Sequence, residues 1–446
     1  MTVVSNRKSL AIIGAGASGI ISSYKASLES EIDFTVYEAS DCVGGAWNYK
    51  AETSSTSCTN YRRNTNYTQT RNTACHWLMD GKLQPKAIYQ NLKTNLPRVL
   101  MQFRDTPFVM EDSNIQDENS VEMNREMFPP HLKVKEYLVA CAEKWNLLPL
   151  IKFNHSVLNV KKNSSKWTLK VLDQISKKTS EIDYDFVFVC NGHFTVPKLP
   201  NHLNYRDFPF PILHSQDYRY PDIATGKRIL VVGTSWSGQD LVREMSHYAS
   251  FIYWSSQQTP SDVAIPQTAN QERIQVVPSI EKFNKDGSVL LKDGSTIQVA
   301  TVYMATGYLY SFNFLDSLKD DTSVSGLHLE LFQASDPTLC FIGLPRNVLP
   351  FPLFEYQAEA AIAFVLGKVS RKDIEKFQSV YSREILGFLD EKESNDIAGL
   401  AHDLGSGREF LYCDLLADLY NGPKVPDWKR KLRCNLRQHR IKALGY

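Results

Sequence analysis

Two glycine-rich segments of the chain have the residue types and the spacing that hold a dinucleotide. The first contains Gly14, Gly16 and Gly19, directly after the apolar residues 10–13. The first glycine of such a turn permits a sharp bend, the second lets the backbone approach a pyrophosphate, and the third lets the following helix pack against the strand. The phosphate charge then lies at the helix N-terminus. The pattern predicts a βαβ unit with a dinucleotide site, and Ser18 is among the expected contacts.

Glu38 and a second group of glycines extend this site. Glu38 follows the predicted strand 34–37, where its carboxylate can accept hydrogen bonds from ribose hydroxyls and would repel a 2′-phosphate. FAD or NAD therefore fits the first site, and NADP does not. Gly44 and the residues after it offer another close approach to a diphosphate and an aromatic ring that could cover a flavin. The contacts predicted for this segment are Gly45, Ala46 and Trp47.

The second glycine segment is a variant of the first. It lies between the predicted strand 229–232 and a helix that reaches to about residue 248, and a further strand, 251–254, follows. That strand ends in Ser255 and Ser256, so no carboxylate stands at the ribose position, although no Arg or Lys stands there to pair with a 2′-phosphate. These features favour NADPH over NADH at the second site. The predicted contacts are Gly233, Ser235, Ser237 and Gly238, with Ser235 in place of the middle glycine.

Two dinucleotide sites in one chain indicate hydride transfer from a nicotinamide to a flavin, and the fate of the reduced flavin then defines the enzyme. A disulfide reductase needs a redox pair of cysteines, but the eight cysteines never form a C-x-x-C pair. They do not match the Cys/His spacing of a metal site either, so no metal is expected. A dehydrogenase that passes electrons to a quinone or an iron–sulfur partner remains open on these motifs alone.

The composition is that of an ordinary globular protein. At about 150 residues per domain, the 446 residues predict two or three domains. Lys and Arg number 50 against 49 Asp and Glu, so the net charge of +1 gives no field that would attract nucleic acid. The longest apolar run, Ala360 to Leu366, is shorter than the roughly 18 residues of a membrane span. The polar N-terminus has no secretion signal, so a cytoplasmic enzyme is expected.

The C-terminal residues 424–446 are strongly basic. They hold eight Lys or Arg and one acid, Asp427. Such a stretch could make weak peripheral contact with an acidic membrane surface, but a solvated helix or tail is the preferred interpretation. The oligomeric state is not determined by the sequence, and a homodimer is compatible with it.

The spacing of apolar and turn residues predicts further elements. A helix is expected at 133–145 and strands at 167–172 and 186–190. A hairpin is expected around Asp293 and Gly294. Two polar segments, 51–75 and 112–126, are expected to be loops.

Taken in order, these motifs resemble the flavin-containing monooxygenase family over most of the chain. Leu92–Asn95 is similar to the L-x-T-N segment of that family, and the Ala-Thr-Gly-Tyr sequence at 305–308 completes the set. Between them, Phe208–Tyr218 resembles the identifying pattern F-x-G-x-x-x-H-x-x-x-[YF], with Phe210 in place of the glycine. Related Baeyer–Villiger enzymes usually have Trp or Pro where Tyr218 stands. Without a hydrophobic C-terminal anchor, the chain looks more like the shorter insect and fungal forms.

The resemblance implies an α/β fold with two Rossmann-like domains. A discontinuous FAD domain, residues 1–191 and 306–446, would hold an inserted, smaller NADPH domain, residues 192–305. NADPH would reduce FAD, O₂ would add to the reduced flavin, and the flavin hydroperoxide would oxygenate the nitrogen or sulfur of a soft nucleophile such as an amine or sulfide. The alternatives are a Baeyer–Villiger-type ketone monooxygenase, an uncoupled NADPH oxidase that releases H₂O₂, and a binding protein with degenerate nucleotide sites.

The resemblance also assigns single residues. Asn95 is the candidate catalytic residue near the reacting edge of the flavin, because an amide donates and accepts hydrogen bonds without supplying an acid that would release peroxide. The alternative is that Asn95 caps a turn before Pro97. His214 is interpreted as a structural hydrogen-bonding residue of the linker rather than as a base. Further residues that resemble flavin contacts of the family are Thr94, Thr306 and Gln357.

Overall fold

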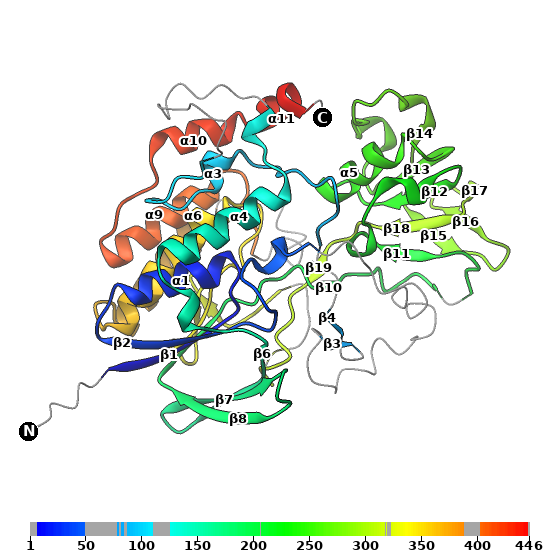
Figure 1. Cartoon of the computed structure of the whole chain (residues 1–446). Coiled ribbons are helices and arrows are strands. Elements are labelled where there is room, and N and C mark those ends of the chain that lie inside the picture. Colours follow the sequence, from blue (N-terminus) through cyan, green and yellow to red (C-terminus); the bar gives the residue numbers. More distant parts are fainter. Residues whose placement is uncertain are drawn as a thin grey trace, which may run out of the picture.

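The chain folds into two α/β units that are joined by a pair of linkers (Figure 1). The computed structural model describes residues 7–49, 78–79, 82–83, 87–109, 125–205, 207–316, 318, 323–387 and 402–444. The polar segment 51–75 and most of the segment 112–126, which were both expected to be loops, lie outside the described residues.

The first unit is built on a seven-stranded sheet with the order β20-β21-β22-β9-β1-β2-β5. The strands from β22 to β5 pair in parallel, and β20, β21 and β22 pair antiparallel. The strands are β1 (Lys8–Ile13), β2 (Ile32–Tyr37), β5 (Ile151–Lys152), β9 (Phe186–Val189), β20 (Leu327–His328), β21 (Phe332–Gln333) and β22 (Leu339–Phe341).

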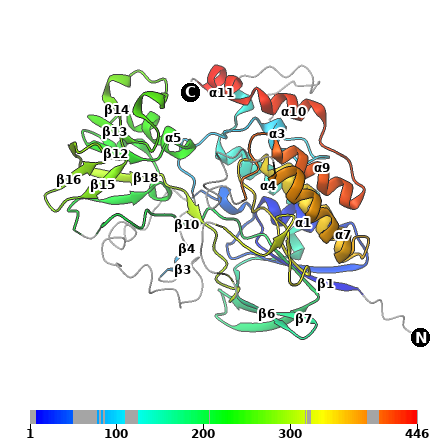
Figure 2. The ribbon, with the colours of Figure 1, turned by 180° about the vertical axis from the view of Figure 1, so that it is seen from behind.

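The two faces of this sheet are covered by different layers. Because side chains alternate along a strand, Leu10 and Ile12 of β1 pack among helices, and Ala11 and Ile13 pack toward a three-stranded antiparallel sheet. Figures 1 and 2 show these two layers on opposite sides of β1. The helices are α1 (Ala17–Ser27), α4 (His131–Lys144), α6 (Pro350–Val365) and α9 (Arg408–Tyr420), and the strands are β6 (His155–Asn163), β7 (Lys166–Asp173) and β8 (Thr179–Tyr184).

The second unit has a parallel five-stranded sheet with the order β11-β18-β12-β13-β14. The hairpin predicted around Asp293 and Gly294 is confirmed, because the strands on either side of it pair antiparallel. The elements are β11 (Ile212–His214), β12 (Arg228–Val232), α5 (Trp236–Met245), β13 (Phe251–Ser255), β14 (Ile274–Val277), β15 (Ile280–Phe283), β16 (Ser288–Leu291), β17 (Thr296–Gln298) and β18 (Thr301–Met304).

The linkers between the units are β10 (Val196–Pro197) and β19 (Tyr308–Leu309), which pair antiparallel. The parallel sheet of the second unit runs from residue 212 to residue 304, whereas the first sheet takes strands from both sides of that stretch. The predicted α/β class with two Rossmann-like units is confirmed. The domain limits 1–191, 192–305 and 306–446 stay a prediction.

The basic C-terminal stretch is folded against the rest of the chain. It forms α10 (Asp427–Cys434) and α11 (Leu436–Leu444), and Lys429 and Arg440 are only 8% and 2% exposed. The preferred interpretation as a solvated helix or tail is therefore wrong for these two residues. Four of its basic side chains also form ion pairs with Asp or Glu residues. The ion pairs are Lys424–Asp418, Arg430–Asp414, Arg433–Glu409 and Arg440–Asp240.

The remaining elements are short or lie at the edges. They are α3 (Arg98–Met101), α7 (Arg371–Tyr381), β3 (Leu78–Met79) and β4 (Lys82–Leu83). Within the part of the chain that the structure describes, no helix has both the length and the apolar character needed to cross a membrane.

Candidate functional site

The first glycine turn can be built only with glycine at two positions. Gly14 has φ +104°, and a Cβ atom there would lie 2.6 Å from the carbonyl oxygen of Cys190 at the end of β9. A Cβ atom on Gly19 would lie 1.8 Å from the carbonyl oxygen of Gly14. Because of these contacts, α1 starts close against the strand ends. The N–H groups of its first turn have no partner within the helix and point to where a phosphate would bind.

Glu38 lies beside this turn, as predicted from its spacing. Its Oε2 atom accepts a hydrogen bond from the backbone N–H of Ala15 at 2.7 Å. Its Oε1 atom accepts hydrogen bonds from the backbone N–H and the hydroxyl of Ser40, at 2.8 and 2.6 Å. A carboxylate has about four lone-pair sites, so this buried group can still accept about one more donor, such as a ribose hydroxyl.

The double-glycine segment forms the opposite wall of a narrow cradle. A Cβ atom on Gly45 would lie 2.8 Å from the Cα atom of Gly16, and the backbone N–H of Gly44 donates to the carbonyl oxygen of Ala15 at 3.0 Å. Backbone thus faces backbone across this part of the site. Ala46 is exposed and Trp47 is half-buried.

Asn48 indicates that this cradle is completed by a bound group. The residue is 5% exposed, and both its Oδ1 and its Nδ2 atoms are buried without a hydrogen-bond partner in the described residues. Leaving a buried polar group unpaired costs about 1–3 kcal/mol. The glycine walls, the carboxylate of Glu38 and this unpaired amide together fit a flavin adenine dinucleotide.

The segment Leu92–Asn95 lies next to this cradle through a residue that sequence reasoning missed. The backbone N–H of His131 donates to the carbonyl oxygen of Leu92 at 3.0 Å, and that of Thr94 donates to the carbonyl oxygen of Pro129 at 3.0 Å. The ring of His131 lies 5.0 Å from the ring of Tyr49, which ends the double-glycine segment. The only sequence signal for His131 is its position two residues before the helix predicted at 133–145.

His131 is also held neutral. It is 7% exposed, and burial lowers its pKa. Its Nδ1 atom has no hydrogen-bond partner within the described residues. The Nδ1 atom of His131 is therefore the third buried polar atom on this side of the cradle that has no partner among the described residues, and it adds no charge.

The structure separates the roles of Thr94 and Asn95. The hydroxyl of Thr94 is buried and donates to the carbonyl oxygen of Leu96 at 2.7 Å, so Thr94 closes the turn before Pro97. The side chain of Asn95 is half-buried and has no hydrogen bond with any described residue. The turn-capping alternative thus describes Thr94, and the amide of Asn95 is available to a ligand.

The second glycine turn repeats the packing of the first. Gly233 has φ +109°, and a Cβ atom there would lie 2.4 Å from the carbonyl oxygen of Ala305 at the end of β18. A Cβ atom on Gly238 would lie 1.9 Å from the carbonyl oxygen of Gly233. Ser235 and Trp236 are exposed at the start of α5, and Ser237 is half-buried. This turn can therefore hold a second dinucleotide in the same manner.

At the end of β13 the hydroxyls of Ser255 and Ser256 form hydrogen bonds within the chain. The hydroxyl of Ser255 donates to the carbonyl oxygen of Pro278 at 3.0 Å, and that of Ser256 accepts from the backbone N–H of Gln258 at 2.9 Å. The position has no carboxylate that would repel a 2′-phosphate.

Two predicted flavin contacts use their polar groups within the chain. Gln357 is fully buried, its Oε1 atom accepts from the backbone N–H of Gly343 at 2.8 Å, and its Nε2 atom donates to the hydroxyl of Tyr412 at 2.8 Å. The hydroxyl of Thr306 donates to the carbonyl oxygen of Lys198 at 2.5 Å. The structure does not bring either side chain to the glycine turns through a hydrogen bond, and their contact with flavin stays a prediction.

The identifying pattern of residues 208–218 forms part of the second unit. The Nδ1 atom of His214 accepts from the backbone N–H of Gln216 at 3.2 Å, and burial lowers the pKa of His214 to about 4. The ring of His214 meets that of Tyr308 edge to face at 5.0 Å. The hydroxyl of Tyr218 donates to Glu244 of α5 at 2.8 Å. A neutral, hydrogen-bonded His214 agrees with a structural role.

Phe210 replaces the glycine of the pattern without backbone strain. It is not among the described residues with positive φ, so the position does not need the conformational freedom of glycine here. Its ring covers Gly287 in the turn between β15 and β16, where a Cβ atom would lie 2.4 Å from the phenyl carbon.

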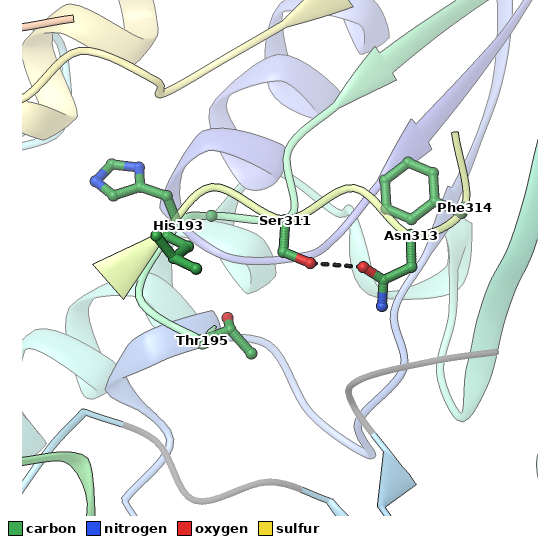
Figure 3. A pocket seen from close by; sticks show the side chains of 7 residues that line it. His193, Thr195, Ser311, Asn313 and Phe314 are labelled. Atoms are coloured by element: carbon green, nitrogen blue, oxygen red, sulfur yellow. Dashed lines mark hydrogen bonds between the residues drawn. The ribbon is translucent and has the colours of Figure 1, made fainter. Parts of the chain in front are cut away.

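Two cavities have no residue of the glycine turns in their walls. One, lined by His193, Thr195, Ser311, Asn313 and Phe314 (Figure 3), holds about 10 Å³, which is room for roughly one water. The hydroxyl of Ser311 donates to Asn313 in its wall at 2.6 Å. The other, of about 190 Å³, lies between α6, α9 and residues 423–429. None of the candidate site residues lines the larger one.

Two dinucleotide turns on two Rossmann-like units define a flavoprotein that accepts electrons from a nicotinamide nucleotide. The model of the family described as Flavin-binding monooxygenase-like matches residues 7–77 and 79–263, which is more than half of the chain. The chain therefore belongs to the flavin-containing monooxygenase family, and its cofactors are FAD and NADPH.

Named relatives and solved structures agree with this family. The chain is 29% identical over 444 residues to Flavin-containing monooxygenase FMO GS-OX-like 9 of Arabidopsis thaliana, a match that covers 96% of this chain and 90% of the relative. The structure of S-allyl-L-cysteine S-oxygenase from Allium sativum has a TM-score of 0.79 at 25% identity and covers 98% of this chain and 93% of that chain. Tmm from Pelagibacter sp. strain HTCC7211 has the same fold, with a TM-score of 0.75 at 22% identity over 97% of this chain and 90% of that chain.

Proposed function

We propose that this flavin monooxygenase uses NADPH and O₂ to oxygenate the nitrogen or sulfur atom of a small soft nucleophile, such as an amine or a thioether. FAD held at the first glycine turn would supply the redox chemistry, in which NADPH provides two electrons and O₂ provides one oxygen atom to the substrate and one to water. The observation that carries this proposal is the amide of Asn95, which has no hydrogen-bond partner among the described residues and directly follows the segment that pairs with residues 129–131 beside the cradle. It can hold a polar atom at the reacting edge without donating the acidic proton that releases H₂O₂.

The described cysteines support oxygen chemistry over disulfide reduction. All six of them are free thiols. Cys190, at the first glycine turn, is buried, and burial raises its pKa to about 12. Burial also raises the pKa of Cys42, two residues before Gly44. A thiol that stays protonated is a poor nucleophile for a disulfide, so these residues do not supply a redox pair.

The proposal assigns FAD to residues 1–191 and 306–446 and NADPH to residues 192–305. Glu38 would hold the adenosine ribose, and the N-terminus of α1 would hold the diphosphate. The proposed FAD contacts are Gly14, Gly16, Ser18, Gly19, Glu38, Gly45, Ala46, Trp47, Thr94, Asn95, Thr306 and Gln357. The proposed NADPH contacts are Gly233, Ser235, Ser237 and Gly238. The charges of residues 424–446 serve the fold in this proposal rather than a membrane surface, since many of them have internal partners.

The test is a measurement of stoichiometry on the FAD-loaded enzyme. NADPH consumed, oxygenated product and H₂O₂ are measured together with a thioether, a tertiary amine and a cyclic ketone as substrates. The expected result is close to one oxygenated product per NADPH for the thioether or the amine. An ester from the ketone would identify a Baeyer–Villiger enzyme, and H₂O₂ in place of every product would identify an oxidase. Purified protein that retains no FAD would identify a degenerate binding protein.

A further inference from the structure

Asp240 of α5 is contacted by residues from two distant parts of the chain. It lies two positions after Gly238, within the first turns of the helix that the second glycine turn begins, and it is 6% exposed. The hydroxyl of Tyr89 donates to its Oδ2 atom. The guanidinium of Arg440 lies 3.7 Å from its Oδ1 atom.

Tyr89 belongs to a strap, residues 87–95, that runs from the second unit to the flavin cradle. At one end, the backbone N–H of Gln90 donates to the carbonyl oxygen of Arg219 at 2.8 Å, and the ring of Tyr89 packs on that of Tyr218 at 5.3 Å. At the other end, Leu92 and Thr94 of the strap pair with His131 and Pro129, directly before Asn95. Asn95 therefore lies only five residues from a contact to the second unit, on the same short segment.

Arg440 belongs to α11, which follows α9 and α10 of the first unit. Figures 1 and 2 both show α11 next to the second unit. Arg440 is 2% exposed, and its guanidinium carbon lies 4.0 Å from the ring centre of Trp236. Trp236 stands inside the second glycine turn and is the first residue of α5. A desolvated ion pair and a cation–π contact thus join the C-terminal helix to the proposed NADPH turn.

We propose that Asp240 is a positioning residue that fixes the nicotinamide-nucleotide unit against the flavin unit from two sides, through Tyr89 of the strap and Arg440 of α11. Hydride transfer needs the reacting atoms of the two cofactors about 3–3.5 Å apart, so the placement of the second glycine turn sets the rate. The same residue couples that placement to Asn95. This inference rests on the proposed assignment of the two units to FAD and NADPH.

Two mild variants test the two arms. Tyr89→Phe removes one oxygen atom and keeps the ring. Arg440→Met removes the charge and keeps an apolar stem. The matched control is Arg430→Met on α10, because Arg430 makes the same two kinds of contact within the first unit, an ion pair with Asp414 at 2.5 Å and a ring contact with Phe410 at 5.3 Å.

The readouts are FAD per chain, the melting temperature, the anaerobic rate of flavin reduction by NADPH, the KM for NADPH, and H₂O₂ formed per NADPH. In both test variants we expect reduction to slow by about tenfold and the H₂O₂ share to rise at unchanged FAD content, since a misplacement of ~1 Å can cost ~100-fold in rate. The control should retain wild-type reduction. In the double variant the effects should not add, because both arms act through Asp240.

Wild-type reduction rate and wild-type H₂O₂ yield in both test variants would overturn the proposal. So would a loss of FAD that parallels the loss of rate, because it would show general unfolding. If Arg440→Met does not fold, Tyr89→Phe decides alone by the same criteria. Failure of NADPH to reduce the wild-type enzyme would instead refute the proposed function.

Discussion

Gly16 and Gly45 face each other across the proposed flavin cradle, and a Cβ atom on Gly45 would lie 2.8 Å from the Cα atom of Gly16. These residues come from separate motifs, one at the start of α1 and one before Trp47. The contact leaves no room for a side chain between the two backbone segments. This geometry makes the predicted diphosphate site sensitive to a single methyl group.

Gly45→Ala should therefore lower FAD affinity. Gly45 has φ +55°, so alanine would add left-handed strain of about 1–2 kcal/mol as well as the steric contact. We expect FAD binding, followed by fluorescence titration of apoprotein, to weaken by more than about tenfold, which corresponds to ~1.4 kcal/mol. Gly226→Ala is the control, because Gly226 has φ +69° and open space around its Cβ position. Equal losses of FAD in both variants would contradict a steric role for Gly45.

Asn48→Leu should separate cofactor binding from stability. Because the amide of Asn48 is buried and has no hydrogen-bond partner among the described residues, removing it should leave the melting temperature of the apoprotein unchanged or raise it. FAD affinity should fall. Gln357→Leu is a matched comparison, since its amide is fully paired and its loss should destabilise the apoprotein by about 1–3 kcal/mol. A lower melting temperature for Asn48→Leu would assign Asn48 to the fold alone.

Asn95→Leu should uncouple NADPH oxidation from oxygenation. The half-buried amide has no partner in the described residues, so its loss should change the free energy of unfolding by less than about 0.5 kcal/mol, as for substitutions that remove no internal contact. The share of NADPH that ends as H₂O₂ should rise severalfold. Asn95→Asp should also uncouple, because it supplies an acid. Full product yield per NADPH in Asn95→Leu would refute this assignment.

His214 should make stability depend on acid pH. Burial lowers its pKa from 6.5 to about 4, so the unfolded chain takes up the proton first as the pH falls. The free energy of unfolding should be unaffected above pH 6.5 and should fall between pH 6.5 and 4, by at most about 3 kcal/mol from this residue. His214→Asn, whose amide oxygen can replace Nδ1, should flatten this part of the curve. Normal flavin reduction without oxygenation in that variant would instead identify His214 as a base.

Much of the cofactor chemistry could be predicted from the sequence because its requirements are local. A carbonyl oxygen excludes a side chain at Gly14, Gly19, Gly233 and Gly238, so each of these positions requires glycine, which can be recognised in the sequence. The spacing from Gly19 to Glu38 follows from the length of one helix and one strand, so it can also be recognised in the sequence. The order of these motifs was sufficient to predict the family and the α/β class.

The tertiary structure alone decided the contacts between distant segments. His131 reaches the strap because two backbone hydrogen bonds pair residues 92–94 with 129–131, and no local pattern encodes that pairing. Arg440 was part of a basic stretch for which a solvated helix or tail was the preferred interpretation, yet packing buries it against Trp236 and Asp240. Gln357 was predicted to contact the flavin, but its buried amide forms hydrogen bonds with Gly343 and Tyr412, which only the fold brings next to it. Glycine turns are determined over a few residues, whereas burial and ion pairing depend on which surfaces the whole chain brings together.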